Sequence, residues 1–236
     1  MTKKKIPVAI VVPAYNEGKV IYDVVRGAKK VFDKSPYAID VVLINDGSKD
    51  NTASEARKAG AIVIDHILNS GAGGATATGL SYANQFGYAI AATMDADGQH
   101  APEDVIAGIV AIQEREADLL IGSRLIDNQG MSRLKVFGNW GLSTFTYLLF
   151  GVRSTDSQSG LRIYSRKALE SLRWKTSGFE FCSEMIWRAK QLGLTIDEYP
   201  IKAIYTDYSK AKGQNNWNGV NILKSLVKRR LAELFE

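Results

Sequence analysis

Short apolar runs alternate with segments of helical periodicity over the first half of the chain. We predict strands at 8–12, 41–44, 61–64, 88–93 and 118–122. Apolar residues at helical spacing predict helices from Val20 to Val31 and at 50–59, 75–85 and 105–115. Continuous β-branched strands are typical of a parallel sheet that is buried on both faces, with helices as the crossovers. The pattern therefore predicts an α/β fold, with a mostly parallel central sheet flanked by helices.

The alternation lapses after Arg124. Residues 132–150 form an apolar helix that belongs either to the core or to a contact with a membrane interface. A strand at 161–165, a helix at 181–192, one or two strands within 195–206 and a polar loop at 207–216 follow. Residues 220–235 read as a basic amphipathic helix, which either docks on the domain or lies on anionic lipid. We expect a domain at 1–216 and a C-terminal helix at 217–236.

Composition narrows the function classes only slightly. The net charge of +5 and the pI near 9.1 favour an anionic partner. Basic residues are spread along the chain, so we expect no nucleic-acid partner. The single cysteine, Cys182, excludes an intramolecular disulfide within this sequence. We see neither a signal-peptide pattern nor an apolar run of about 20 residues that could span a bilayer. We expect a cytoplasmic protein, peripheral at the inner face of the membrane.

The loop at 94–100 carries the most informative chemistry. It lies between a predicted strand and a helix start at Pro102. Asp95, Asp97 and the amide of Gln99 are an all-oxygen set that suits Mg²⁺ or Mn²⁺. The sequence Asp-Ala-Asp-Gly is also typical of a simple turn without a metal. An EF-hand is excluded because its sixth position would be His100, and the chain has no P-loop motif.

Polar and aromatic residues recur where the predicted parallel strands end, which is the edge where ligands bind in open α/β sheets. They are Pro13, Tyr15, Glu17, Asp46, Asp95, Asp97 and Arg124. Carboxylates suit base and ribose recognition, an aromatic ring suits base packing, and the acid pair suits a metal diphosphate. The set indicates a nucleotide-sugar site. The glycines at 71–74 do not match the dinucleotide pattern, because its last glycine falls on Thr76; we interpret them as a close-packed turn.

Three segments in this order, 11–17, 45–48 and 94–100, resemble the inverting family 2 glycosyltransferases of GT-A fold (the nucleotide-diphospho-sugar transferase fold). The subgroup that the chain resembles most is the dolichyl- or polyprenyl-phosphate sugar transferases. Segments 122–124, 156–162 and 208–210 and Glu184 extend the resemblance over nearly the whole chain. The sequence departs from it at Asn45, where many relatives have Asp, and at Leu161, where the subgroup often has Phe.

The resemblance implies a role for each site residue. The donor would be bound by Pro13, Tyr15, Glu17, Asp46, Asp95, Ala96 and Asp97, and Mg²⁺ or Mn²⁺ by Asp95, Asp97 and Gln99. Arg124 and Lys210 would meet phosphate groups near the acceptor, and Asp156 and Arg124 would act at the reacting centre. The implied partners are a nucleotide sugar, with a UDP-sugar favoured over GDP-mannose, a polyprenyl phosphate, the membrane surface and a small membrane protein.

The resemblance leaves the acceptor chemistry open. A lipid monophosphate has a second pKa of about 6, so it is a nucleophile at neutral pH and needs no base. A sugar hydroxyl, as in cell-wall or surface polysaccharide synthesis, would need Asp156 as its base. A non-catalytic nucleotide-sugar-binding protein could dispense with the metal acids, which are present here. A nucleotidyltransferase should have a glycine-rich basic loop after its first strand, and residues 13–18 are not one.

Overall fold

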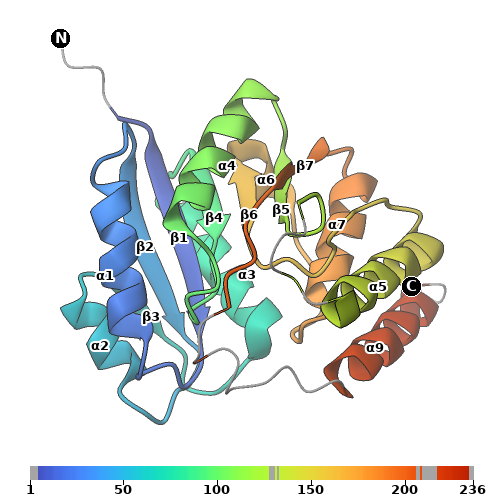
Figure 1. The fold of residues 1–236 in the computed structure, drawn as a ribbon, viewed down its shortest axis with the longest axis horizontal. Helices are drawn as coiled ribbons and strands as arrows, with labels where there is room; N and C mark the ends of the chain where they lie inside the picture. The colour runs from blue at the N-terminus through green and yellow to red at the C-terminus, as the bar shows by residue number, and fades with distance from the viewer. Residues whose placement is uncertain (1–4, 128–130, 132, 206–207, 209–216, 234–236) are drawn as a thin grey trace.

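The computed structural model describes residues 5–127, 131, 133–205, 208 and 217–233. They form a seven-stranded sheet in the order β3-β2-β1-β4-β6-β5-β7 (Figure 1). Its strands are β1 Pro7–Ala14, β2 Ala38–Asn45, β3 Ile62–Asp65, β4 Ile90–Thr93, β5 Leu119–Ser123, β6 Arg162–Ser165 and β7 Ile196–Pro200. Every described strand except β6 runs in the same direction. The predicted mostly parallel α/β sheet is therefore confirmed.

Helices cover both faces of the sheet in two layers (Figure 1). The first layer consists of α1 Ile21–Phe32, α2 Thr52–Lys58 and α4 Pro102–Glu114. The second consists of α3 Gly71–Gln85, α6 Arg166–Ser171 and α7 Phe181–Gln191, with α5 Arg133–Phe150 and α9 Trp217–Glu233 side by side at one end. The loops that follow the parallel strands all open at one edge of the sheet.

Alternation along β1 explains how one strand builds both core layers. Val8, Ile10 and Val12 face the α1 and α4 layer, whereas Ala9 and Val11 face the α3 layer, and all five are fully buried. Each buried valine or isoleucine contributes about 1.5–3 kcal/mol relative to an exposed one. The continuous apolar run that predicted this strand follows from its burial on both faces.

One local prediction was wrong. The glycines at 71–74 form the first turn of α3, not a separate turn, so this helix starts earlier than 75. Close packing does require them, because a Cβ on Gly73 would lie 2.6 Å from the Thr176 carbonyl oxygen. Residues 195–206, where one or two strands were predicted, contribute one, β7, and the described residues 201–205 form none. The sequence pattern also missed the short helix α6.

The C-terminal helix α9 docks on the domain through one face. Leu226 is fully buried, and Arg229 Nε donates to Glu184 Oε1 of α7 at 3.1 Å in a buried ion pair. Val227 and Leu231 on the same helix are exposed. None of the described helices is long and apolar enough to cross a membrane.

Candidate functional site

Hydrogen bonds join the segments that follow β1 and β2, at the edge of the sheet where a ligand site is predicted. Asn16 takes a left-handed backbone conformation (φ 54°), which asparagine tolerates better than most residues. Its N–H donates to Ser48 Oγ at 2.9 Å, and its side-chain oxygen accepts from Lys49 N at 2.9 Å. The Glu17 N–H donates to Thr52 Oγ1 at 2.8 Å. Predicted donor residues on the two strand ends are thus held together.

Glu17 and Tyr15 lie on this unit in different environments. Glu17 is buried, and Tyr208 OH donates to its Oε2 at 2.8 Å. Burial and that hydrogen bond to Glu17 raise the pKa of Tyr208 to about 12, so the phenol is a donor at neutral pH. Tyr15 is 42% exposed, and Pro13 lies in β1 just before it. An exposed ring beside a buried carboxylate suits a base and a ribose.

Asp46 is buried under the start of α3 and holds that helix. Its Oδ1 accepts from His66 Nδ1 and from both the N–H and the hydroxyl of Ser70, and its Oδ2 accepts from Gly71 N, all at 2.7–2.8 Å. Ser70 is the N-cap of α3, so Asp46 satisfies amides that a helix start leaves unpaired. Burial alone would raise the pKa of Asp46, but the donors from Ser70, His66 and Gly71 hold it below its usual value.

The acid loop, residues 94–100, presents two carboxylates that are oriented differently. Asp97 accepts from the Gln99 N–H at 3.0 Å and from the Gln99 side-chain amide. Asp95 Oδ2 lies 2.9 Å from His100 Nε2, and the His100 side chain is only 3% exposed. His100 Nδ1 is buried without a hydrogen-bond partner among the described residues. His100 therefore holds the Asp95 carboxylate from the buried side of the loop, a role that the sequence did not indicate.

The charges around the two acids of the acid loop affect them differently. Burial raises the pKa of Asp97, and the charge of Asp95 raises it further. For Asp95, burial acts to raise the pKa, but His100, Arg124 and Arg162 outweigh it and lower the pKa. No cluster of three or more His, Cys, Asp or Glu side chains is arranged for a metal in the described part of the chain. Two acids and an amide nevertheless fit Mg²⁺ or Mn²⁺, which usually take one or two protein carboxylates and complete their shell with substrate phosphates and water.

Asp156 and Arg124 form a two-pronged ion pair beside the acid loop. Arg124 Nε donates to Asp156 Oδ2 at 2.7 Å and Nη2 donates to Oδ1 at 2.9 Å. The Arg124 N–H also donates to Oδ2, at 3.2 Å. The Asp156 side chain is fully buried, whereas that of Arg124 is 21% exposed. Burial acts to lower the pKa of Arg124, but Asp156 and Asp95 more than offset it and raise it, so the guanidinium is permanently charged.

Gly160 joins the Asp156 turn, residues 156–160, to the acid loop. A Cβ on Gly160 would lie 2.3 Å from Asp95 Oδ1, and Thr93 Oγ1 of β4 donates to the Gly160 carbonyl at 2.7 Å. The fold therefore brings Asp95, Asp97, Arg124 and Asp156 to one place. Ala96, between the acids, is buried. Lys210 lies outside the described residues, so its phosphate-binding role stays a prediction.

We predict that Gly160→Ala lowers the transfer rate by about 100-fold, equivalent to about 2.7 kcal/mol of barrier, with little loss of stability. The new methyl group displaces the Asp95 carboxylate, while the backbone at 160 is not in the left-handed region. Steady-state rates and thermal melting measure the two effects. Gly27→Ala is the matched control, because a Cβ there meets nothing within 4 Å. A full rate in Gly160→Ala would contradict the prediction.

Comparisons with known proteins agree with this geometry. The glycosyl transferase family 2 model matches residues 9–173. The chain is 41% identical over 227 residues to an uncharacterized protein of Methanocaldococcus jannaschii, covering 94% of this chain and 91% of that one. It is 38% identical over 250 residues to a UDP-N-acetylglucosamine–dolichyl-phosphate N-acetylglucosaminyltransferase of Methanococcus voltae, covering 96% and 97%.

A bacterial relative and a solved structure extend the comparison. The polyprenol monophosphomannose synthase of Mycolicibacterium smegmatis is 29% identical over 232 residues, covering 93% of this chain and 84% of that one. The fold matches glucosyl-3-phosphoglycerate synthase from Mycobacterium tuberculosis in complex with Mn²⁺, UDP and glucosyl-3-phosphoglycerate. The TM-score is 0.68 at 17% identity, covering 94% of this chain and 77% of that one. The chain is a glycosyltransferase with the GT-A fold, and it belongs to glycosyl transferase family 2.

Proposed function

We propose that this glycosyltransferase moves a sugar from a nucleotide-sugar donor, a UDP-sugar before GDP-mannose, to a polyprenyl phosphate, with inversion and with Mg²⁺ or Mn²⁺. Relatives named for dolichyl phosphate and polyprenol support the acceptor class. UDP appears in the name of the Methanococcus voltae relative and, with Mn²⁺, in a solved structure of the same fold. The intact set of Asp95, Asp97 and Gln99 favours an enzyme over a non-catalytic nucleotide-sugar-binding protein.

The hydrogen bonds and the burial of Asp156 are the observations that favour one acceptor class over the other. A sugar hydroxyl must lose its proton to a base, and Asp156 is the residue predicted for that task. In the structure both of its oxygens accept hydrogen bonds from Arg124, and its side chain is fully buried. A phosphate monoester with a second pKa of about 6 is already ionised at neutral pH and makes no such demand. The geometry therefore favours a phosphate nucleophile over a hydroxyl.

The remaining site residues would bind either the donor or the acceptor. Tyr15 and Glu17 would receive the nucleoside, and Asp46 would hold the start of α3 beside it. Asp97, Asp95 and the Gln99 side chain would hold the metal, which when bound offsets charge on the leaving nucleoside diphosphate. The partly exposed guanidinium of Arg124 would attract the acceptor phosphate, while Asp156 fixes its orientation. Both phosphate groups would then lie beside fixed positive charge.

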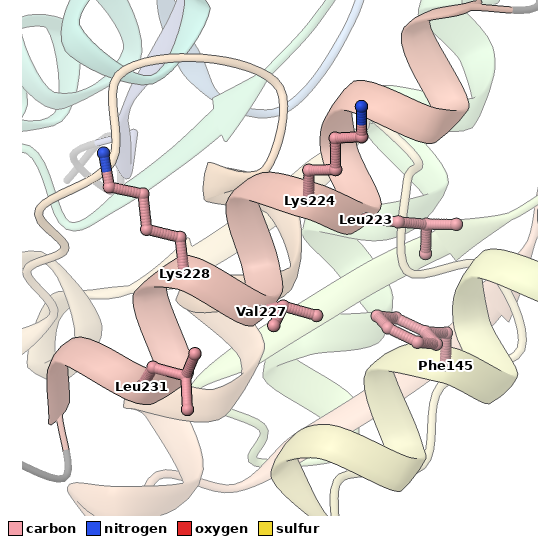
Figure 2. Close-up of a pocket in the computed structure, with 6 residues that line it drawn as sticks. All are labelled: Phe145, Leu223, Lys224, Val227, Lys228 and Leu231. Carbon is pink, nitrogen blue, oxygen red and sulfur yellow. The ribbon is translucent and has the colours of Figure 1, made fainter.

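We further propose that α5 and α9 place the enzyme at the inner, cytoplasmic face of the membrane. Phe137, Trp140 and Leu148 of α5 are 57–73% exposed. Figure 2 shows the groove between the two helices, where Phe145 faces Val227 and the Lys224 and Lys228 side chains extend from α9. Apolar surface beside lysines suits the interface of an anionic bilayer, which holds the lipid acceptor. A small membrane protein that covers the same surface is the competing partner.

We predict that Lys224→Glu/Lys228→Glu weakens binding to anionic phospholipid vesicles by at least about 100-fold, because each basic residue near such a surface contributes about 1 kcal/mol and each glutamate that replaces one is itself repelled. Vesicle co-sedimentation measures the effect. Arg26→Glu/Lys30→Glu on α1 makes the same charge change on another face and should bind within about threefold of the wild type. Equal losses in both variants, or none in the α9 variant, would contradict placement through α9.

A donor panel tests the proposed function. Purified enzyme is incubated with labelled UDP-glucose, UDP-N-acetylglucosamine or GDP-mannose, with Mn²⁺ or Mg²⁺ and undecaprenyl or dolichyl phosphate. We expect label in the organic phase with one donor, and none when EDTA is present. Transfer only to soluble sugars would overturn the lipid acceptor.

A further inference from the structure

Arg162, the first residue of β6, is a buried cation that the proposed chemistry does not use. It is 1% exposed and forms no salt bridge within 4.0 Å among the described residues. Burying a charge without an opposite charge beside it is costly, and it persists only where polar groups or a field compensate it. The groups that bind the Arg162 guanidinium therefore indicate its role.

Backbone carbonyls supply most of that compensation. Arg162 Nη2 donates to the Ser157 carbonyl at 2.7 Å and Nε donates to the Ser159 carbonyl at 3.0 Å. Its Nη1 donates to the Cys182 carbonyl at 2.9 Å and approaches Met185 Sδ at 3.1 Å. The first two carbonyls belong to the Asp156 turn, and the other two groups belong to α7. One planar guanidinium thus ties the turn to the helix behind it.

The Asp156 turn contacts both the acceptor-side residue Arg124 and the donor-side residue Asp95. At its start, Asp156 orients Arg124, and its carbonyl accepts from the Ser159 N–H at 3.2 Å. At its end, Gly160 lies against the Asp95 carboxylate. A shift of this turn would move the acceptor-side and donor-side residues together.

We infer that Arg162 is a positioning residue for glycosyl transfer, holding the Asp156 turn so that Asp156 keeps its pair with Arg124 and Gly160 keeps its contact with Asp95. Arg162 is too buried to touch a substrate and is not a catalytic residue. Lysine cannot replace it, because a single ammonium on a flexible stem does not reproduce the planar fork that reaches carbonyls on the turn and on α7 together. This inference rests on the proposed function for its kinetic readout.

The test compares Arg162→Lys and Arg162→Gln with Arg166→Gln. Arg166 bonds the carbonyls of Asn84 and Tyr88 and pairs with Glu170, so it supports the fold away from the site. The readouts are kcat and KM well below the melting temperature, binding of UDP with Mn²⁺, and amide hydrogen exchange in the peptide covering the turn. For Arg162→Lys we expect kcat to fall by about 100-fold, acceptor KM to change by less than about threefold, and exchange in the turn to speed up by at least about tenfold.

A double-mutant cycle separates positioning from general destabilisation. In an Asp156→Asn background, Arg162→Lys should lower kcat by less than about threefold further, because the arrangement it maintains is already lost. Arg166→Gln should lower the melting temperature and leave kcat and exchange in the turn unchanged. A normal kcat in folded Arg162→Lys, or equal and independent losses in both backgrounds, would overturn the inference. Hydrogen exchange tests the positioning role of Arg162 separately from the proposed acceptor. If the wild type makes no lipid-linked sugar, the proposed function fails. If exchange in the turn is unchanged in Arg162→Lys, the positioning role fails.

Discussion

Asp97→Asn is expected to lower the rate of sugar transfer by about a thousand-fold, or about 4 kcal/mol of barrier, while the protein stays as stable as the wild type or becomes more so. The carboxylate is the part of the acid loop that would bind the metal diphosphate most directly. Burial and the charge of Asp95 raise its pKa, which means that the fold disfavours its charged form. Asparagine keeps the shape and removes the repulsion. Function and stability should therefore move in opposite directions.

Three measurements on Asp97→Asn check this opposition. Steady-state kinetics give the rate, calorimetric titration with Mn²⁺ in the presence of UDP gives metal binding, and thermal melting gives stability. Asp33→Asn, an exposed residue after α1, is the control and should match the wild type in all three. Retention of metal binding and of more than a tenth of the activity would show that Asp97 does not hold the metal.

Asp156→Asn is expected to cost more than about 100-fold in rate and about 2–3 kcal/mol in the free energy of unfolding. The substitution leaves the Arg124 guanidinium mostly buried without its anion. Breaking a fully buried pair costs about 3–5 kcal/mol, and the 21% exposure of Arg124 reduces that figure through solvent screening. Kinetics and denaturant unfolding measure the two losses. The pH profile of the residual activity should stay flat above about pH 7, because the acceptor phosphate is already ionised.

The double variant Asp156→Asn/Arg124→Gln separates the two effects. Removing both partners takes away the buried unpaired charge, so stability should recover most of the loss. Activity should not recover, because no charge is left to attract the acceptor phosphate. A residual rate in Asp156→Asn that rises steeply with pH up to about 9 would instead indicate a hydroxyl acceptor whose base has been lost.

Much of the sheet was predictable because each strand is indicated by the residues within it. Val8–Val12 reads as a strand from its own letters, since a strand buried on both faces carries no polar residues. The position of β6 was different: a run at 161–165 predicts a strand but does not say that it inserts antiparallel between β4 and β5. That arrangement depends on the path of the whole second half of the chain.

The residue types of the site were also predictable, but their partners were not. Asp46 follows β2 as expected, yet its role in holding the start of α3 depends on Ser70 and Gly71, 24 and 25 residues away. The start of α3 at Gly71 was missed for the same reason, because Asp46, which accepts from the Ser70 and Gly71 N–H groups, lies in the loop after β2. Asp156 and Arg124 lie 32 residues apart, and no local spacing indicates that one neutralises the other.

The most direct test of the central claim offers the enzyme two acceptors that differ only in the attacking group. A polyprenyl phosphate and the corresponding polyprenol, of equal chain length and at equal concentration, are incubated with Mn²⁺ and the donor that gives product. If the nucleophile is an ionised phosphate that needs no base from Asp156, the phosphate accepts sugar at a rate independent of pH above about 7 and the alcohol accepts none. Transfer to the alcohol at a comparable rate, rising with pH, would contradict it.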